Sequence, residues 1–142
     1  MSSFGILSYG AYVPSTRLQR KAIAASNSWF NSSLRAFAQG ERAIGGWDED
    51  VITMGAEAAR ESLVGFDPAQ VSSIVLASTT LPFADRQNSG VIRSALMLPT
   101  PVRTADTTGS LRSATTALVE ALVGSADGST LVIGSDARKA KA

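Results

Sequence analysis

The pattern of hydrophobic and polar positions is clearest in the middle of the chain, directly after the acidic residues 48–50. Ile52, Ala56, Ala59 and Leu63 follow at the spacing that places side chains on one face of an α-helix. Carboxylates beside a helix N-terminus cap its free N–H groups and interact favourably with its dipole. The pattern therefore predicts a helix over residues 51–64, with the acidic residues interpreted as its cap rather than as a calcium site.

Short β-rich apolar runs alternate with helical patterns along the rest of the chain. The predicted strands cover residues 4–13, 73–79, 102–105 and 130–135. The other predicted helices cover residues 18–25, 84–98 and 110–123. This order favours an α/β fold with a largely parallel sheet and right-handed crossovers. No repeat or linker interrupts the sequence, so we expect a single domain over residues 1–142.

The stretch over residues 26–47 is the least regular part of the sequence. It contains Ser, Asn and Gly together with Trp29 and Trp47. A long irregular insertion of this kind is typical of a functional loop or lid. The two indole rings either cover a ligand or pack against the flank of the sheet, and packing is the favoured interpretation.

Composition excludes several classes of function. The 142 residues are 44% hydrophobic and 18% charged, with a net charge of +1, which is typical of a globular domain and gives no electrostatic footprint for nucleic acid. The chain has no Cys and no His, so the usual metal ligands and the commonest general base are absent from it. We expect no bound metal or cofactor, no membrane span and a cytoplasmic location.

The segment over residues 106–118 carries the strongest hint of chemistry. A strand ending near Asp106, a Gly-Ser turn and a small-residue helix place residue 111 at a helix N-terminus. A cysteine at such a position is activated because the helix end lowers the pKa of the thiol. This chain has Leu111 there, and a leucine side chain has no nucleophilic atom.

The neighbours of Leu111 have alternative interpretations. Ser110 is expected to cap the helix, and as a nucleophile it would need a positioned base that this chain does not supply. Arg112 either binds a carboxylate or phosphate or pairs with an acidic neighbour, and pairing is favoured.

Six segments in order resemble the N-terminal half of the thiolase superfamily, and in particular 3-hydroxy-3-methylglutaryl-CoA synthases and β-ketoacyl-acyl-carrier-protein synthase III. They are residues 10–14, 40–44, 48–59, 74–80, 106–118 and 131–136. The resemblance implies a layered α-β-α half with a mixed, mostly parallel sheet. It also implies that the chain is a fragment, which lacks the last strand of that half and the whole second half.

The resemblance implies an acyltransferase that condenses acyl-CoA or acyl-carrier-protein thioesters. Leu111 then occupies the position of the nucleophilic cysteine, and Thr79 that of the glutamate acid/base of the synthase branch. Trp29, Arg42 and Arg112 become candidate contacts for the thioester substrate, although Arg42 is equally well explained by an internal salt bridge. The family also implies a homodimer, or a heteromeric complex with a thiolase-like partner.

Three interpretations therefore stay open. The chain is the N-terminal part of a condensing enzyme, or a non-catalytic subunit that binds acyl-CoA or an active partner, or an unrelated α/β binding domain. One His, together with an Asn or a second His, in the remainder of the protein would favour the enzyme.

Overall fold

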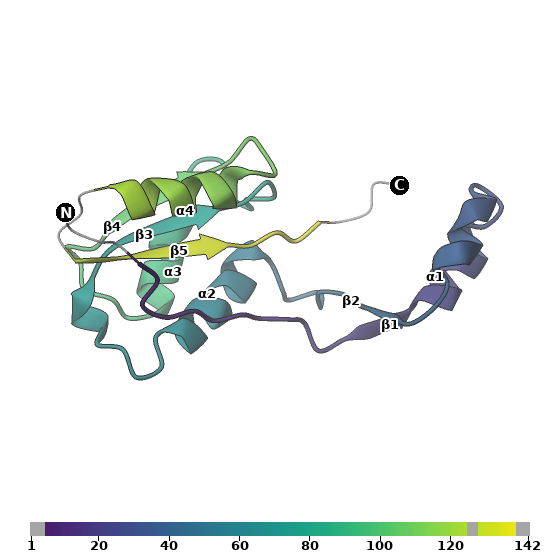
Figure 1. Ribbon diagram of the computed structural model, residues 1–142, viewed down its shortest axis with the longest axis horizontal. Helices are drawn as coiled ribbons and strands as arrows, with labels where there is room; N and C mark the ends of the chain where they lie inside the picture. Colours follow the sequence, from purple (N-terminus) through teal and green to yellow (C-terminus); the bar gives the residue numbers. More distant parts are fainter. Residues whose placement is uncertain (1–4, 125–127, 139–142) are drawn as a thin grey trace. The chain divides into compact units, whose positions relative to one another are not determined.

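The computed structural model describes residues 5–124 and 128–138. The chain divides into two compact units, of which one combines residues 1–12 with residues 50–142 and the other covers residues 13–49 (Figure 1). Each unit is described by itself.

The larger unit is built on a three-stranded parallel sheet. Its strands are β3 (Val71–Ala77), β4 (Arg103–Thr107) and β5 (Ser129–Gly134), in the order β4-β3-β5. The alternation of strands and helices in the sequence predicts this parallel arrangement, and the structure confirms it. Each strand begins and ends within two residues of its predicted bounds.

Helices cover both faces of this sheet (Figure 1). Helices α2 (Val51–Ser62) and α3 (Asn88–Ala95) lie on one face, and α4 (Ser113–Val123) lies on the other. Two adjacent residues of β5 illustrate the layering, because Ile133 contacts α2 at Gly55, whereas Gly134 lies against Ala114 of α4. The larger unit therefore has the layered α-β-α arrangement that the resemblance implies.

The start of α2 follows from its sequence. The Asp50 carboxylate accepts hydrogen bonds from the backbone N–H groups of Ile52 (2.9 Å) and Thr53 (2.8 Å). The Thr53 hydroxyl lies 2.8 Å from the Asp50 N–H and accepts from it, which completes a capping box. The cap predicted from residues 48–50 is thus confirmed at Asp50.

The core of the larger unit lies between the sheet and α2 and α3. Ile74 and Leu76 of β3 are fully buried and pack in one cluster with Val51 of α2, Ile92 of α3 and Ile133 of β5. A strand that is buried on both faces needs a nearly continuous apolar run, and β3 supplies it.

Asp106, at the end of β4, joins the sheet to the first turn of α3. Its carboxylate accepts hydrogen bonds from the backbone N–H groups of Asn88 (2.6 Å) and Ser89 (2.8 Å) and from the Asn88 side-chain amide (2.9 Å). Partial burial on its own would raise the pKa of Asp106. Hydrogen bonds from Ser89 and Asn88 outweigh the burial and hold this pKa below its ordinary value.

The smaller unit contains a two-stranded antiparallel ladder and a short helix. Strands β1 (Arg17–Gln19) and β2 (Glu41–Ala43) pair with each other, and they enclose helix α1 (Arg20–Asn27) and a 3-10 turn over Ser32–Phe37. The ladder is not anticipated by the sequence pattern, because each strand is only three residues long and exposes polar side chains.

Two predicted elements differ from the structure. Residues 5–13 form no strand, and Phe4 of that prediction lies outside the described residues. An apolar run becomes a strand only where a neighbour supplies backbone hydrogen bonds, and this segment pairs with no described strand. The helix predicted over residues 84–98 begins only at Asn88, because residues 81–87 form an irregular loop that the Asn88 side chain binds at Phe83.

We predict that Asp106→Asn destabilises the protein by about 1–3 kcal/mol, because an NH2 group, which can only donate, replaces one of the two acceptor oxygens that face N–H donors. The pKa of Asp106 is lowered in the folded state, so its stabilising effect is present at neutral pH and is lost as the pH falls through the folded-state value. Urea unfolding at several pH values measures both effects. An equal loss of stability in the exposed control Asp85→Asn would contradict the prediction.

Candidate functional site

The candidate site lies where the carboxyl ends of β3 and β5 meet the start of α4. Parallel strands bring these ends to one edge of the sheet, which is where open α/β sheets bind ligands. A cavity of about 280 Å³ lies at this edge. It is lined by residues 77–79, 110, 113–114 and 134–136.

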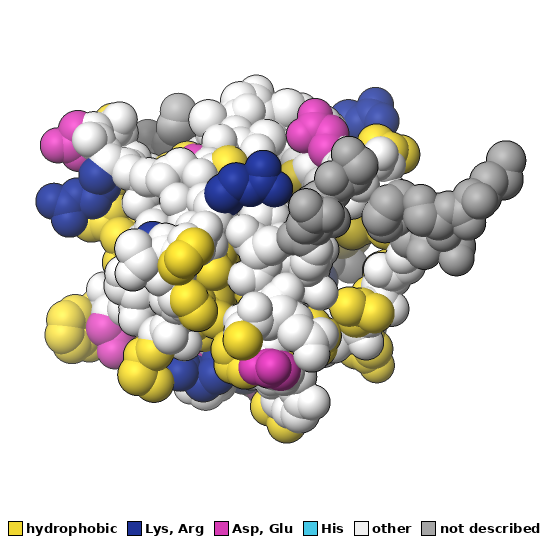
Figure 2. Space-filling model, turned by 90° about the vertical axis from the view of Figure 1, so that its left-hand side faces the viewer, with side chains coloured by type: hydrophobic (Ala, Val, Ile, Leu, Met, Phe, Trp, Pro, Cys, Tyr) yellow, Lys and Arg dark blue, Asp and Glu magenta, His cyan; other side chains and the backbone are white. Residues whose placement is uncertain are grey.

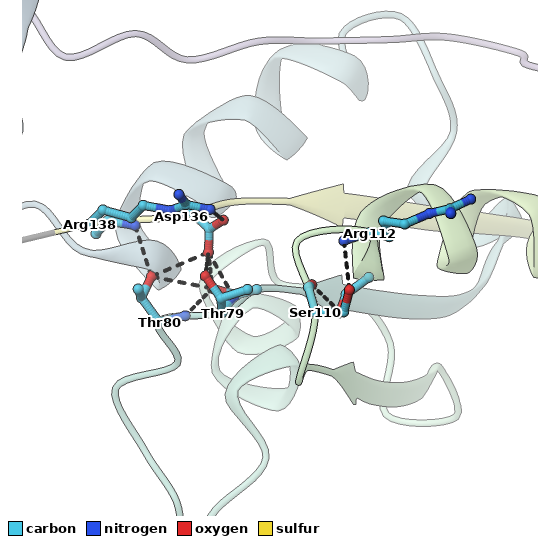
Figure 3. Close-up of polar contacts among 9 residues, drawn as sticks. Thr79, Thr80, Ser110, Arg112, Asp136 and Arg138 are labelled. Carbon is cyan, nitrogen blue, oxygen red and sulfur yellow. Dashed lines mark hydrogen bonds and ion pairs between the residues drawn. The ribbon is translucent and has the colours of Figure 1, made fainter.

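Asp136, two residues after β5, is the centre of the polar contacts at this edge (Figure 3). Its carboxylate accepts hydrogen bonds from the Thr79 backbone N–H (2.7 Å), the Thr79 hydroxyl (3.0 Å) and the Ser78 hydroxyl (3.0 Å). The Ala137 N–H donates to the Thr80 hydroxyl oxygen at 2.9 Å. The segments that follow β3 and β5 are thereby tied together.

The hydrogen bonds to Asp136 set its ionisation. Partial burial on its own would raise the pKa of this carboxyl group. Donation from Thr79 and Ser78, with a further contribution from the Arg138 guanidinium at 3.8 Å, outweighs the burial and holds the pKa of Asp136 below its ordinary value. The group is therefore an ionised acceptor at neutral pH and a weak base.

Asp136 lies within residues 131–136, one of the segments that carry the family resemblance, but the sequence analysis predicts no role for it. The available signal is its position, since an acidic residue that directly follows a buried strand lies at the ligand-binding edge of a parallel sheet. Thr79, the predicted acid/base position, lines the cavity, and its hydroxyl is engaged with Asp136.

Ser110 lies in the turn before α4 and lines the same cavity. Its hydroxyl oxygen accepts from the Arg112 N–H at 3.2 Å, and its carbonyl accepts from the Ser113 N–H (3.0 Å) and the Ser113 hydroxyl (2.6 Å). These bonds order the turn before α4, but the N-cap of α4 is Arg112, which has no side-chain cap hydrogen bond, so Ser110 does not cap the helix as the sequence predicts.

Leu111 lies two residues before the first residue of α4, and its side chain is 68% exposed. Neither Leu111 nor Arg112 lines the cavity. Figure 3 shows Arg112 at the start of α4. Within residues 5–124 and 128–138, Arg112 forms no ion pair, so the acidic neighbour favoured by the sequence interpretation is not found there.

The other two candidate contacts lie in the smaller unit. Trp29 follows α1 with 84% of its surface exposed and stacks edge-on against Phe30, and Arg42 lies in β2 opposite Leu18. Trp47 is 98% exposed within this structure, and the packing of the two indole rings against the sheet stays a prediction.

Three sequence expectations concern a metal ion, a membrane span and nucleic acid. In the described part of the chain, no group of three or more His, Cys, Asp or Glu side chains is placed to hold a metal ion. No described helix is long and apolar enough to cross a membrane. On the face in Figure 2, Lys and Arg side chains are dispersed among acidic and neutral ones.

Solved structures define the class of fold. A hydroxymethylglutaryl-CoA synthase from Bacillus subtilis superposes on 96% of this chain with a TM-score of 0.83 and 20% identity, and the match covers 36% of that chain. The β-ketoacyl-acyl-carrier-protein synthase III of Thermus thermophilus matches 96% of this chain and 43% of its own, with a TM-score of 0.77 and 20% identity. The chain therefore has a thiolase-like fold, of which it forms a part.

Curated relatives show that the chain belongs to the thiolase-like superfamily, of which it is a partial chain. The hydroxymethylglutaryl-CoA synthase of Aeropyrum pernix is 33% identical over 144 aligned positions, which cover 98% of this chain and 40% of the relative. The hydroxymethylglutaryl-CoA synthase of Thermococcus gammatolerans is 37% identical over 120 aligned positions, which cover 83% of this chain and 33% of the relative. The chain thus spans about a third to two fifths of the length of these relatives. No family model matches the sequence.

We predict that a cysteine introduced at position 111 has a thiol pKa below the ordinary value of about 8.5, because the start of α4 stabilises a thiolate. Leu111→Cys is matched by Val123→Cys, which places an equally accessible thiol at the opposite end of α4, where the original side chain is 75% exposed. The sequence has no other cysteine, so the pH dependence of iodoacetamide labelling reports each thiol separately. Equal pKa values for the two variants would show that position 111 does not experience the helix end.

Proposed function

We propose that this chain is the N-terminal part of an acyl-CoA condensing acyltransferase of the hydroxymethylglutaryl-CoA synthase or ketoacyl synthase III type, with Leu111 in the position of the nucleophile. The observation that carries the proposal is the 33% identity to such a synthase over 98% of the chain. The strand, turn and helix around Leu111 support it, because this residue lies in the turn that joins β4 to α4, two residues before the helix begins.

The residues at this edge argue against covalent catalysis by the chain itself. Leu111 has no atom that can attack a thioester carbonyl, and Thr79 offers a hydroxyl that is already engaged with Asp136. The Ser110 hydroxyl accepts a hydrogen bond from the Arg112 N–H in the turn before α4, and the chain contains no His that can remove its proton. We therefore propose that this edge binds a thioester without an activated nucleophile.

A coenzyme A thioester is the substrate class that the proposal implies. One structural neighbour, with 22% identity and a TM-score of 0.71, is described as bound to 3-hydroxy-3-methylglutaryl coenzyme A. In this chain the exposed guanidinium groups of Arg42 and Arg112 are suited to phosphate groups, and the exposed Trp29 ring is suited to stacking on adenine. An acyl-carrier-protein thioester carries the same phosphopantetheine chemistry. The cytoplasmic location stays a prediction.

We predict that acetyl-CoA binds to the chain and that Arg42→Ala and Trp29→Ala each weaken binding roughly tenfold, because each removes a phosphate or stacking contact. Isothermal titration calorimetry measures the affinity. Arg35→Ala is the matched control, since it removes an arginine from the same unit outside the proposed contact set. Absence of binding at millimolar acetyl-CoA, or equal weakening by the control, would contradict the proposal.

A second function is favoured by Leu111 itself, namely a non-catalytic subunit that binds acyl-CoA or an active thiolase-like partner. The intact mass of the chain, measured after incubation with acetyl-CoA, distinguishes the two functions. Binding without any acyl adduct in the intact mass supports the non-catalytic subunit. An adduct of one acetyl group that hydroxylamine removes indicates an ester on a hydroxyl of the chain rather than an acetylated lysine, and so a hydroxyl in place of the missing thiol.

We also propose that the protein self-associates through the outer edge of β4, because the resemblance implies strand pairing across a dimer interface at this position. The sheet order leaves β4 with one neighbouring strand in the described residues. Gln87 now occupies part of this edge, since its amide donates to the Thr104 carbonyl and accepts from the Thr104 hydroxyl, each at 2.5 Å. A side chain in this position protects an edge strand against unwanted pairing.

We predict that Gln87→Ala lowers the dissociation constant of the dimer by roughly fivefold, because it frees the Thr104 carbonyl for a partner strand. Sedimentation equilibrium over a range of protein concentrations measures this constant. A protein that stays monomeric with and without the substitution would show that β4 is not the interface.

A further inference from the structure

The two carboxylate oxygens of Asp136 have different surroundings. In the described residues, Oδ1 accepts every hydrogen bond that this side chain receives, from the Thr79 N–H (2.7 Å), the Thr79 hydroxyl (3.0 Å), the Ser78 hydroxyl (3.0 Å) and the Thr80 hydroxyl (3.4 Å). Within the same residues, Oδ2 accepts no hydrogen bond, and the Arg138 guanidinium lies 3.8 Å from it. Asp136 therefore presents one carboxylate oxygen whose acceptor sites are free.

The ion pair with Arg138 leaves these acceptor sites open. Its separation of 3.8 Å is longer than a hydrogen bond, and the Arg138 side chain is 54% exposed. Exposed ion pairs of this kind contribute little free energy, because water screens both charges. A ligand that donates to Oδ2 at hydrogen-bond distance can therefore displace this contact at small cost.

Ser110 adds a neutral donor to the cavity that Asp136 lines. The two residues come from different segments, Ser110 from the turn before α4 and Asp136 from the segment after β5 (Figure 3). The Ser110 hydroxyl oxygen accepts from the Arg112 N–H at 3.2 Å. Within residues 5–124 and 128–138, the proton of this hydroxyl has no acceptor. The cavity therefore offers a ligand one free donor and one charged acceptor.

The remaining walls limit the size of a ligand. The cavity has a volume of about 280 Å³, which is the room of roughly nine water molecules at about 30 Å³ each. Apart from Asp136, the described residues that line it are Ala, Ser, Thr or Gly. Pockets for large apolar ligands are lined mainly by bulky hydrophobic and aromatic side chains. The lining therefore fits a short chain with a polar substituent better than a long hydrocarbon chain.

The free groups of the cavity define the chemistry of that substituent. A hydroxyl can donate to Asp136 Oδ2, and a hydrogen bond to a charged acceptor is stronger than one between neutral groups. The same hydroxyl oxygen can accept from Ser110. A hydrocarbon chain would shield Oδ2 from water without replacing the hydrogen bonds that water makes. A carboxylate on the ligand would be repelled by the like charge of Asp136.

We propose that this cavity selects a short, uncharged acyl group with a hydroxyl substituent, which donates to Asp136 Oδ2, and rejects an acyl group that ends in a carboxylate. This assignment rests on the proposed function, because it takes the ligand at this edge to be a thioester. It deepens that function by naming the acyl group and by making Asp136 the residue that determines specificity. The hydroxyl is only bound, so no covalent bond forms or breaks in this step.

The test uses N-acetylcysteamine thioesters, which carry an acyl group and the thioester without the phosphates and adenine of coenzyme A. The butyryl, 2-hydroxybutyryl, 3-hydroxybutyryl and malonyl thioesters are titrated into the full chain, and the NMR shifts of the Thr79 and Ser135 backbone amides report the affinity of each. We expect at least one hydroxybutyryl thioester to bind about fivefold tighter than the butyryl thioester, and the malonyl thioester to bind most weakly.

Asp136→Asn sharpens the test because it exchanges an acceptor for a donor. The Thr79 N–H requires an acceptor, so the amide oxygen of the variant takes the place of Oδ1 and the NH2 group takes the place of Oδ2. We expect the order of the probes to invert, with the malonyl thioester bound about fivefold tighter than either hydroxybutyryl thioester. The control Asp85→Asn removes the same charge from an exposed residue outside the cavity lining, so it is expected to leave the order unchanged.

The unaltered chain decides the proposal even if Asp136→Asn does not fold. Equal affinities for the butyryl and hydroxybutyryl thioesters, tightest binding of the malonyl thioester, or no binding of any of the four probes would overturn it. So would a folded Asp136→Asn variant that keeps the original order. The acetyl-CoA titration is a separate measurement. A chain that binds acetyl-CoA but does not discriminate among the probes refutes only the acyl assignment, whereas the expected order without acetyl-CoA binding contradicts only the proposed coenzyme A ligand.

Discussion

The double pairing of β3 is the constraint on which the rest of the larger unit depends. Of the three strands in the described sheet, β3 alone has a neighbour on both sides, and its Ile74 and Leu76 side chains are fully buried. Burial of this backbone is tolerable because β4 and β5 satisfy its hydrogen-bonding groups. The parallel register then brings Thr79 beside Asp136, so the polar edge of the sheet is a direct consequence of the pairing.

The two aspartates at this edge are structural acceptors and are poorly suited to proton transfer. Asp106 and Asp136 both accept several hydrogen bonds from backbone and side-chain donors, and both have lowered pKa values. A carboxylate that is stabilised in its charged form is a poor proton acceptor, so neither group is suited to activate Ser110 or Thr79. Their charges hold α3 and the ends of β3 and β5 in position instead.

The sequence predicts those parts of the fold that local pattern and local capping determine. The α2 helix carries its own cap at Asp50, and the short β-rich apolar run of β3 favours a buried strand, so both are found close to their predicted bounds. Residues 5–13 have a strand-like pattern, but a strand also needs a neighbour, which sequence pattern does not reveal. The central role of Asp136 depends on contacts between segments 57 residues apart, so the local segment that contains it does not reveal that role.

Leu111 gains a physical meaning from the surface around it. Leucine at an exposed turn contributes no capping and no charge to the start of α4, so local structure does not require it. Further along the same helix, Leu118, Val119 and Val123 are also exposed, and α4 buries only Ser113 and Ala117 in the described chain. Apolar groups that gather on one helix are typical of a surface that another polypeptide covers. Leu111 adds exposed apolar area directly beside this helix, so it belongs to the same apolar surface.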